Sequence, residues 1–426
     1  MPIRTVPAVV LGTRGPFSRL SLDAIVQVPL SARLNRDRPQ GCCSRPGRFA
    51  VPAQHRHDGA VTVRKVAVEE EMFLVDPGTR QLVASSHRAV EQAPGDEVEQ
   101  ELFLQQVETQ SDPHHALGDV IADLKEARRG AAKAADGAGA GARLAAMPTP
   151  VMPDDEGRLT PKRRYEQMMA RFGRVGREAL ACGMHVHVDI ADDEEGVAVL
   201  DRIRPWLPLV QAVSTGSPFD LGIDTSYASW RAEIWDSWPS SGPVEPFGDA
   251  AGYEKAVEAI VASGAALDHG MLYFDARLAR DYPTVEIRVA DICTDLADTA
   301  LVAALSRGLV ETCAEAWHAR TPLTPWRVDL LRAARWQARR HGVSASLLHP
   351  LDGALVPAAD ALGALVDAIG PALERAGDRE LVEDGIARVL AEGTGADRQR
   401  AAAGPDLDLR AVVDDVLEST AASHRD

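Results

Sequence analysis

The chain has 426 residues, of which 45% are hydrophobic and 26% charged, so it has enough apolar side chains for one large domain or two to three smaller ones. Its 46 basic and 63 acidic residues give a net charge of −17, which excludes binding dominated by a nucleic-acid backbone. No apolar run approaches the roughly 18 residues that a membrane helix requires. The five cysteines are odd in number and show no paired spacing, which favours a reducing, cytoplasmic setting.

The first 60 residues differ in composition from the rest of the chain. They contain nine arginines, no lysine and three acids, with Pro, Gly, Ser and His scattered without period. An Arg-rich targeting leader is one interpretation, and an unstructured tail translated from a start codon placed too far upstream is another. An apolar core of signal-peptide length is missing. We predict a disordered leader over residues 1–60 and a single folded domain over residues 61–426.

Four segments have the alternation or apolar content of β-strands. The first covers residues 61–75 and stops at the turn formed by Asp76, Pro77 and Gly78. The other three are residues 101–110, 184–190 and 284–290.

Helical periodicity follows between and after these strands. It predicts helices over residues 114–135, 162–180 and 295–318, and a mostly helical, Ala-rich segment over the last 100 residues. The irregular alternation of strands and helices is typical of an α+β protein with a largely antiparallel sheet and helices packed on one face.

Glu69 and Glu71 lie two residues apart in the first predicted strand. Side chains in a strand alternate between faces, so both should point one way while Glu70 points the other. A solvated strand face would explain this pair without any function. The apolar residues on both sides indicate a central strand instead, where carboxylates need cations.

Two later strands repeat the arrangement. His185 and His187 should share one face of an apolar strand, which indicates a metal or substrate site or, alternatively, two hydrogen-bonded core histidines. Glu286 and Arg288 should also share a face, and the alternative for them is a simple ion pair. The sequence has no P-loop, no dinucleotide fingerprint and no nucleophile elbow. The remaining acids, histidines and arginine indicate a site that holds phosphates through divalent metals.

Taken together, these motifs resemble those of a known family, the YbdK-type carboxylate–amine ligases, which form the second glutamate–cysteine ligase family. The resemblance covers roughly residues 63–420 and rests on five motifs in order, at residues 68–75, 101–112, 184–188, 227–235 and 284–291.

The resemblance implies a glutamine synthetase-like fold: a curved antiparallel sheet with helices on the convex face and a mostly helical C-terminal part. Its concave face would hold ATP, Mg²⁺ and an amino-acid carboxylate, and the histidine ligand should also accept Mn²⁺. Carried over residue by residue, one metal would be held by Glu69, Glu101 and Glu108, and a second by Glu71, His185 and Glu286.

The same resemblance implies roles for three further residues. Arg288 would face the transferred phosphoryl group, Arg288 and His187 would contact ATP, and Arg231 would bind a substrate carboxylate or an acyl phosphate. The chain departs from the family pattern at Glu101, where a shorter Asp is usual, and at residues 146–150, where relatives often have a substrate-side histidine.

The function implied is ATP-dependent amide formation through an acyl phosphate, with weak glutamate–cysteine ligase activity. The expected partners are small amino-acid substrates, without nucleic acid or membrane, and a homo-oligomer is compatible with this function. Two alternatives stay open. A metal-dependent hydrolase would use His185 and His187 together with further ligands at strand ends, and a non-catalytic relative would bind a nucleotide or metabolite.

Overall fold

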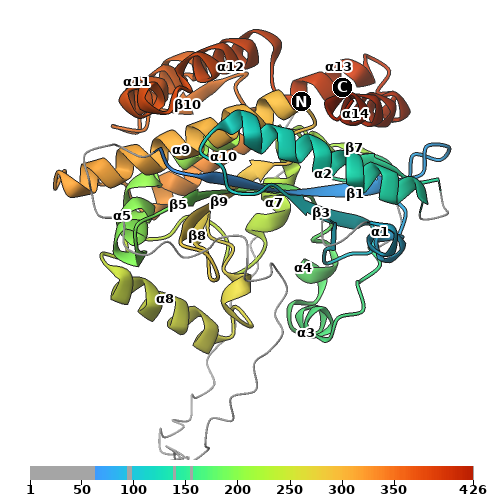
Figure 1. Cartoon of the computed structure of the whole chain (residues 1–426), viewed down its shortest axis with the longest axis horizontal. Coiled ribbons are helices and arrows are strands. Elements are labelled where there is room, and N and C mark those ends of the chain that lie inside the picture. The colour runs from blue at the N-terminus through green and yellow to red at the C-terminus, as the bar shows by residue number, and fades with distance from the viewer. Residues whose placement is uncertain (1–62, 94–97, 138–140, 154–156, 426) are drawn as a thin grey trace, which may run out of the picture. The chain divides into compact units, whose positions relative to one another are not determined.

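The computed structural model describes residues 63–93, 98–137, 141–153 and 157–425 (Figure 1). The leader predicted over residues 1–60 lies outside these ranges. The described residues contain a seven-stranded sheet in which every pair of strands is antiparallel, as predicted. The strand order is β2-β3-β1-β5-β9-β8, and β4 pairs with the end of β1 at Phe73–Val75, on the edge that β5 occupies further back. The strands are β1 (Val66–Val75), β2 (Glu99–Gln100), β3 (Gln106–Gln110), β4 (Arg143–Ala145), β5 (Gly183–Asp189), β8 (Ala276–Leu278) and β9 (Thr284–Asp291).

Two smaller two-stranded sheets and a set of helices surround this sheet. The small sheets are β6 (Phe219–Asp220) with β7 (Ile223–Asp224), and β10 (Ser346–Leu348) with β11 (Leu355–Pro357). The helices are α1 (Ser86–Gln92), α2 (Leu117–Gly137), α3 (Arg163–Phe172), α4 (Arg174–Arg177), α5 (Asp193–Ile203), α6 (Leu207–Val213), α7 (Trp230–Asp236), α8 (Ala250–Ser263), α9 (Leu296–His318), α10 (Val328–His341), α11 (Ala358–Ala376), α12 (Arg379–Glu392), α13 (Gly395–Ala403) and α14 (Leu409–Ser423).

The main helical layer covers one face of the sheet, which we call the helix face. Figure 1 shows α2 and α9 on this face and α11 to α14 further out, so the C-terminal part is mostly helical as expected. The short helices α3, α4 and α8 lie on the opposite side of the sheet, which we call the site face (Figure 1). The sequence analysis expected helices on one face of the sheet only, whereas helices also lie on the side of the site face.

Element boundaries differ most from the predictions at three places, of which the first is β1, predicted from residue 61 but beginning at Val66. The extended segment predicted over residues 101–110 is a turn followed by β3. The helix predicted over residues 162–180 is two helices, α3 and α4, which meet at Gly173 with φ +60°. Glycine adopts this conformation without a Cβ clash, so it allows the chain to turn between the two helices.

Glu70 points to the helix face and forms an ion pair with Arg128 of α2, and both side chains are 0% exposed. The guanidinium donates to both carboxylate oxygens, with Nη2–Oε1 at 2.7 Å and Nε–Oε2 at 2.8 Å. Arg128 also donates to the backbone carbonyls of Cys293 and Thr294. One buried pair therefore joins β1, α2 and the connection from β9 to α9.

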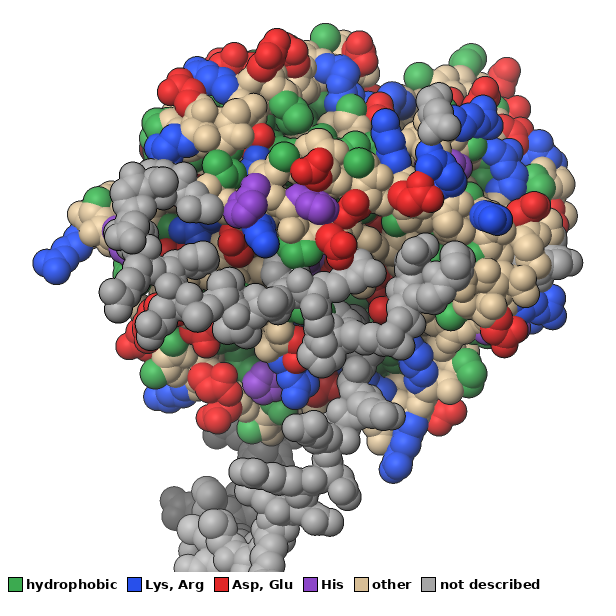
Figure 2. Space-filling model, viewed as in Figure 1, with side chains coloured by type: hydrophobic (Ala, Val, Ile, Leu, Met, Phe, Trp, Pro, Cys, Tyr) green, Lys and Arg blue, Asp and Glu red, His purple; other side chains and the backbone are tan. Residues whose placement is uncertain are grey.

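No helix of the described residues combines the length and the apolar character needed to cross a lipid bilayer. Acidic and basic side chains are mixed over the surface that Figure 2 shows.

The buried pair generates a stability prediction. Arg128→Met removes the cation and leaves the Glu70 carboxylate without its counter-charge, so the free energy of unfolding should fall by about 3–5 kcal/mol. Urea unfolding followed by circular dichroism measures this change. The control is Arg174→Met, which breaks an exposed pair with Glu178 and should cost far less. Equal losses for the two variants would contradict the role of the buried pair.

Candidate functional site

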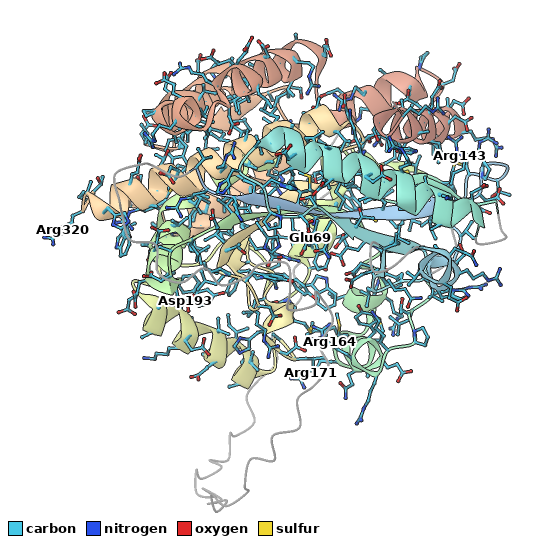
Figure 3. The ribbon with its side chains drawn as sticks, in the orientation of Figure 1. Glu69, Arg143, Arg164, Arg171, Asp193 and Arg320 are labelled. Atoms are coloured by element: carbon cyan, nitrogen blue, oxygen red, sulfur yellow. The ribbon has the colours of Figure 1, made fainter. Side chains whose placement is uncertain are left out.

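The register of the sheet brings side chains from four strands together on the site face. Glu69 of β1 pairs with His185 of β5, and His187 of β5 pairs with Glu286 of β9. Glu286 pairs in turn with Arg277 of β8. Directly paired residues of an antiparallel sheet point to the same face, so these five side chains form one continuous charged row. Figure 3 shows Glu69 near the middle of the sheet.

Two groups of side chains on the site face have the geometry of metal ligands, and one of them adds Glu108 of β3, which pairs with Glu71, to members of this row. Within each group, one ligand atom per residue lies within 4.8 Å of the others. Glu69 belongs to both groups. Their members are Glu69, Glu108 and His185 in the first, and Glu69, His187 and Glu286 in the second.

Hydrogen bonds and charges orient these ligand atoms. The Nδ1 atom of His185 lies 3.2 Å from Glu69 Oε2, while His187 has Nε2 3.3 Å from Glu69 Oε1 and Nδ1 3.0 Å from Thr284 Oγ1. Burial alone would raise the pKa of Glu69, but the two histidines outweigh it and lower that pKa. Burial, reinforced by Arg288, lowers the pKa of His185, which favours the neutral imidazole that binds metals.

Two of the sequence-predicted ligands take other positions. Glu71 does point to the site face, but its Oε2 accepts a hydrogen bond of 2.6 Å from the backbone N–H of Gly183, and it belongs to neither group. Glu101 accepts a 2.7 Å hydrogen bond from Leu102 N and is likewise outside both groups. His187 belongs to the second group of possible metal ligands, and its contact with ATP stays a prediction. The division into two ligand sets therefore differs from the one that the resemblance implies.

Arg288 lies beside the row and contacts Glu286 Oε1, and its Nη1 is 3.4 Å from His185 Nδ1. A bulge in β9 sets this position. Between the pairs Met184–Ala290 and Val186–Ile287, β5 has one residue and β9 has two. The strict alternation that we predicted for β9 therefore ends at Arg288, and Asp291 rather than Ala290 is the next residue opposite Gly183.

Arg277 is a site residue that the sequence analysis missed. Its guanidinium binds both oxygens of Glu286, with Nε–Oε2 at 2.6 Å and Nη2–Oε1 at 3.0 Å. The signal was weak, because β8 has only three residues, although polar residues alternate with apolar ones over Asp275, Ala276 and Arg277. Glu286 thus has a full counter-ion in addition to Arg288.

Arg231 is held on the site face by the first turn of α7. Ser229 caps this helix by accepting from Ala232 N, and its hydroxyl donates to Asp291 Oδ1 at 2.7 Å. The backbone N–H of Arg231 donates to Ser217 Oγ, which itself donates to Asp291 Oδ2. Asp291 is therefore a second residue missed by the sequence analysis, and it positions the helix that carries Arg231.

Gly183 leaves the space that the Arg231 guanidinium occupies. An ideal Cβ at Gly183 would lie 2.5 Å from Arg231 Cζ, which no real Cβ contact tolerates. Arg231 is 4% exposed, and its Nε has no hydrogen-bond partner within the described part of the chain. Burial lowers the pKa of Arg231, although Asp291 and Glu71 act in the opposite direction. A buried cation with an unused donor next to the row is suited to an anionic ligand.

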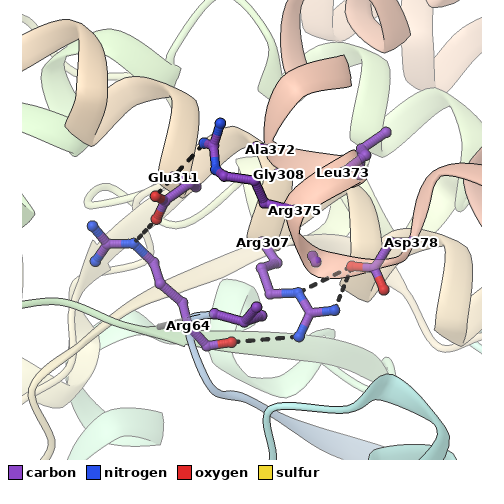
Figure 4. Close-up of a pocket in the computed structure, with 10 residues that line it drawn as sticks. Arg64, Arg307, Gly308, Glu311, Ala372, Leu373, Arg375 and Asp378 are labelled. Atoms are coloured by element: carbon purple, nitrogen blue, oxygen red, sulfur yellow. Dashed lines mark hydrogen bonds and ion pairs between the residues drawn. The ribbon is translucent and has the colours of Figure 1, made fainter. Parts of the chain in front are cut away.

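A separate cavity on the helix face, with an empty volume of about 320 Å³, does not show these features (Figure 4). Its charged side chains bind one another: Arg64 and Arg375 contact Glu311, and Arg307 contacts Asp378. We therefore assign the functional site to the sheet face that carries Glu69.

The hydrolase alternative requires more histidine or aspartate ligands at strand ends. Across the described residues, the two ligand groups contain no histidine other than His185 and His187. The arrangement of carboxylates and arginines fits a phosphate-handling site better.

Comparisons with solved structures identify the class of fold. The chain superposes on the glutamate–cysteine ligase of Francisella tularensis, solved in complex with AMP, with a TM-score of 0.62 and 13% identity over 86% of this chain and 94% of that one. It also superposes on a bifunctional glutathione synthetase from Pasteurella multocida with a TM-score of 0.61 and 14% identity, over 84% of this chain and 52% of that one. The fold is thus that of glutamate–cysteine ligases.

Sequence comparisons identify the family. The model of glutamate–cysteine ligase family 2 matches residues 65–414, so the chain belongs to this family and is an enzyme of the amide-forming ligase class. One relative, named "Putative glutamate–cysteine ligase 2-1", from a Nocardioides species, is 46% identical over 85% of this chain and 98% of its own length. Another, named "Putative glutamate–cysteine ligase 2-2", from Frankia alni, is 42% identical over 84% of this chain and 97% of its own length.

The contact between Gly183 and Arg231 generates a second prediction. Gly183→Ala should displace the guanidinium and lower ligase activity at least about tenfold, or ~1.4 kcal/mol of barrier, without changing any charge. Amide product is measured by mass spectrometry, and the melting temperature shows whether the variant is folded. The control is Gly118→Ala in α2, where an added Cβ meets nothing within 4 Å. A folded Gly183→Ala variant with normal activity would show that Arg231 is not needed in this position.

Proposed function

We propose that the protein is an ATP-dependent carboxylate–amine ligase that forms its amide bond through an acyl phosphate. The observation that carries this proposal is the charged row on the site face, with two possible metal-ligand groups that share Glu69 and with Arg288 beside them. Membership of the ligase family and the AMP bound to the similar Francisella tularensis enzyme support the use of ATP.

The donor atoms fit hard divalent cations. Both groups combine carboxylate oxygens with one imidazole, a set that suits Mg²⁺ and also accepts Mn²⁺. The Nε2 atom of His185 is buried and, within the described residues, has no hydrogen-bond partner, so a ligand can still occupy it. When bound, such ions neutralise the phosphate charges of ATP.

The reaction then has two steps. A substrate carboxylate oxygen attacks the γ-phosphorus of ATP, the bond to the β-phosphate oxygen breaks, and ADP leaves. The amine nitrogen next attacks the acyl carbon, loses a proton and expels phosphate. Positioning and charge stabilisation are the main requirements of phosphoryl transfer, and the protein supplies both through arginines.

Arg288 is the residue suited to the transferred phosphoryl group. Glu286 already has both oxygens bound by Arg277, so Arg288 is not required to neutralise it. Arg231, buried and with a free Nε, is suited to a substrate carboxylate or to the acyl phosphate. We infer glutamate and cysteine as substrates from the names of the relatives, with weak activity expected on this pair.

The proposal is tested by incubating the purified full chain with ATP, Mg²⁺ and pairs of amino acids, while ADP release and product mass are measured. An ADP-forming reaction that yields a product lighter than the two substrates by one water supports the ligase. Failure to release ADP with any amino-acid pair would refute it.

A third prediction concerns Arg288. Arg288→Lys keeps the charge but loses the fork of donors that binds two phosphoryl oxygens. The rate of acyl-phosphate formation should fall at least about tenfold, or ~1.4 kcal/mol, while ATP affinity changes little. Rapid-quench measurement of ADP gives this rate. If Arg288→Lys kept normal turnover but melted at a lower temperature, or if Glu286→Gln rescued Arg288→Ala, the arginine would be a structural partner of Glu286.

A fourth prediction uses the shared position of Glu69. Since Glu69 belongs to both ligand groups and Glu108 to one, Glu69→Gln should weaken two Mn²⁺ sites and Glu108→Gln only one. Calorimetric titration with Mn²⁺ in the presence of a non-hydrolysable ATP analogue measures the number of ions bound. Equal stoichiometry for the two variants would contradict the grouping.

A further inference from the structure

An open cavity with an empty volume of about 370 Å³ lies on the site face next to Arg288. Arg231 and Arg288 line it together with residues that have no part in the mechanism above, namely Gln211 of α6, Trp235 of α7, Asp275 before β8 and Arg335 of α10.

Apart from Arg335 Nε, whose ion-pair partner is Asp275, three buried polar atoms of these lining residues have no hydrogen-bond partner within the part of the chain that the structure describes. Arg231 Nε and Trp235 Nε1 are donors, and Gln211 Oε1 is an acceptor. Gln211 is only 2% exposed. Buried polar groups of native proteins are nearly always satisfied, so these atoms need partners from a ligand or from water. A ligand that satisfies them must therefore offer both hydrogen-bond acceptors and a hydrogen-bond donor.

Asp275 adds a buried negative charge to the same cavity. Asp275 is 9% exposed. Among the described residues its one ion-pair partner is Arg335, with Arg335 Nε 3.1 Å from Asp275 Oδ1. Arg335 is not reserved for it, because Arg335 Nη1 binds Asp236 at 2.7 Å. Burial raises the pKa of Asp275, although Arg335 acts to lower it.

The charges behind Asp275 do not cancel. The network contains three acids and two cations, linked by ion pairs: Glu233, Asp236, Asp275, Arg335 and Arg339. One acid is therefore in excess, and the cavity wall at Asp275 is where a ligand can approach it. A bound cation would complete the balance.

We propose that this cavity binds the head group of an amino-acid substrate, with the ammonium on Asp275 and Gln211 Oε1 and the carboxylate on Arg231 and Trp235 Nε1. The proposal rests on the ligase function proposed above and extends it, because it assigns the recognition of the amino group to Asp275. Arg288 also lines the cavity, so an amino acid bound there lies next to the transferred phosphoryl group. Both the carboxylate substrate and the amine substrate of such a ligase carry this head group.

The test compares each amino acid with the analogue that lacks its amino group. Calorimetry on the full chain, with Mg²⁺ and a non-hydrolysable ATP analogue present, measures binding of L-glutamate against glutarate and of L-cysteine against 3-mercaptopropionate. The wild type should prefer the amino acid in at least one pair. Asp275→Asn should weaken binding of that amino acid at least tenfold and leave its analogue unchanged. The pair that responds identifies which substrate occupies the cavity.

Two further variants keep the test decisive. Asp236→Asn removes a charge from the same Arg335 but does not line the cavity, so it should lower the melting temperature without changing the preference. If Asp275→Asn fails to fold, Gln211→Leu removes the acceptor without changing charge and should reduce the same preference.

The inference is overturned if the wild type binds none of the four compounds or shows no preference in either pair. It is also overturned if Asp275→Asn keeps the preference, or weakens amino acid and analogue equally. These results are independent of the ligase test. If the wild type forms amide product but Asp275→Asn does not change the preference for the amino acid, only the inference is refuted. A wild type that binds amino acids through Asp275 but releases no ADP would refute the ligase function.

Discussion

The ion pair between Glu70 and Arg128 is the contact on which the site depends. β1 carries three consecutive carboxylates, and strand alternation sends the middle one into the helix layer. A buried carboxylate without a cation would be too costly, so the strand keeps its place only because Arg128 meets Glu70 there. A slip of β1 by one residue would exchange the faces of all three carboxylates. The pair thereby helps to specify the register that exposes Glu69 to the two histidines.

On the site face, each acid already has a partner from the protein. Glu69 lies between His185 and His187, Glu286 is bound by Arg277, and Glu71 accepts from Gly183 N. A cation that binds Glu286 must therefore compete with Arg277 for its oxygens. The site is organised before any ligand arrives, and binding rearranges existing contacts instead of ordering loose side chains.

The sequence predicts which residues share a face, because that follows from the two-residue period of a strand. Glu69, His185 and Glu286 were found in this way, and the expected helical C-terminal part is also present. The sequence does not predict which strand pairs with which at what register, and this decided the ligand groups. The pattern of side chains also does not predict that Glu71 accepts a hydrogen bond from a backbone N–H, that of Gly183. Arg277 lies on a three-residue strand, which is too short for periodicity to detect.

The bulge in β9 divides that strand into two parts with different tasks. Up to Arg288 it supplies residues to the charged row, and after the extra residue Asp291 returns to the same side to hold the start of α7. The number of residues in β9, as well as their types, therefore determines which face Asp291 points to. With strictly regular pairing of the same residues, Ala290 would lie opposite Gly183 and Asp291 would point into the helix layer, away from the two serines that hold the start of α7. Arg288 and Asp291 can share a face at an odd spacing of three residues only because β9 carries the extra residue.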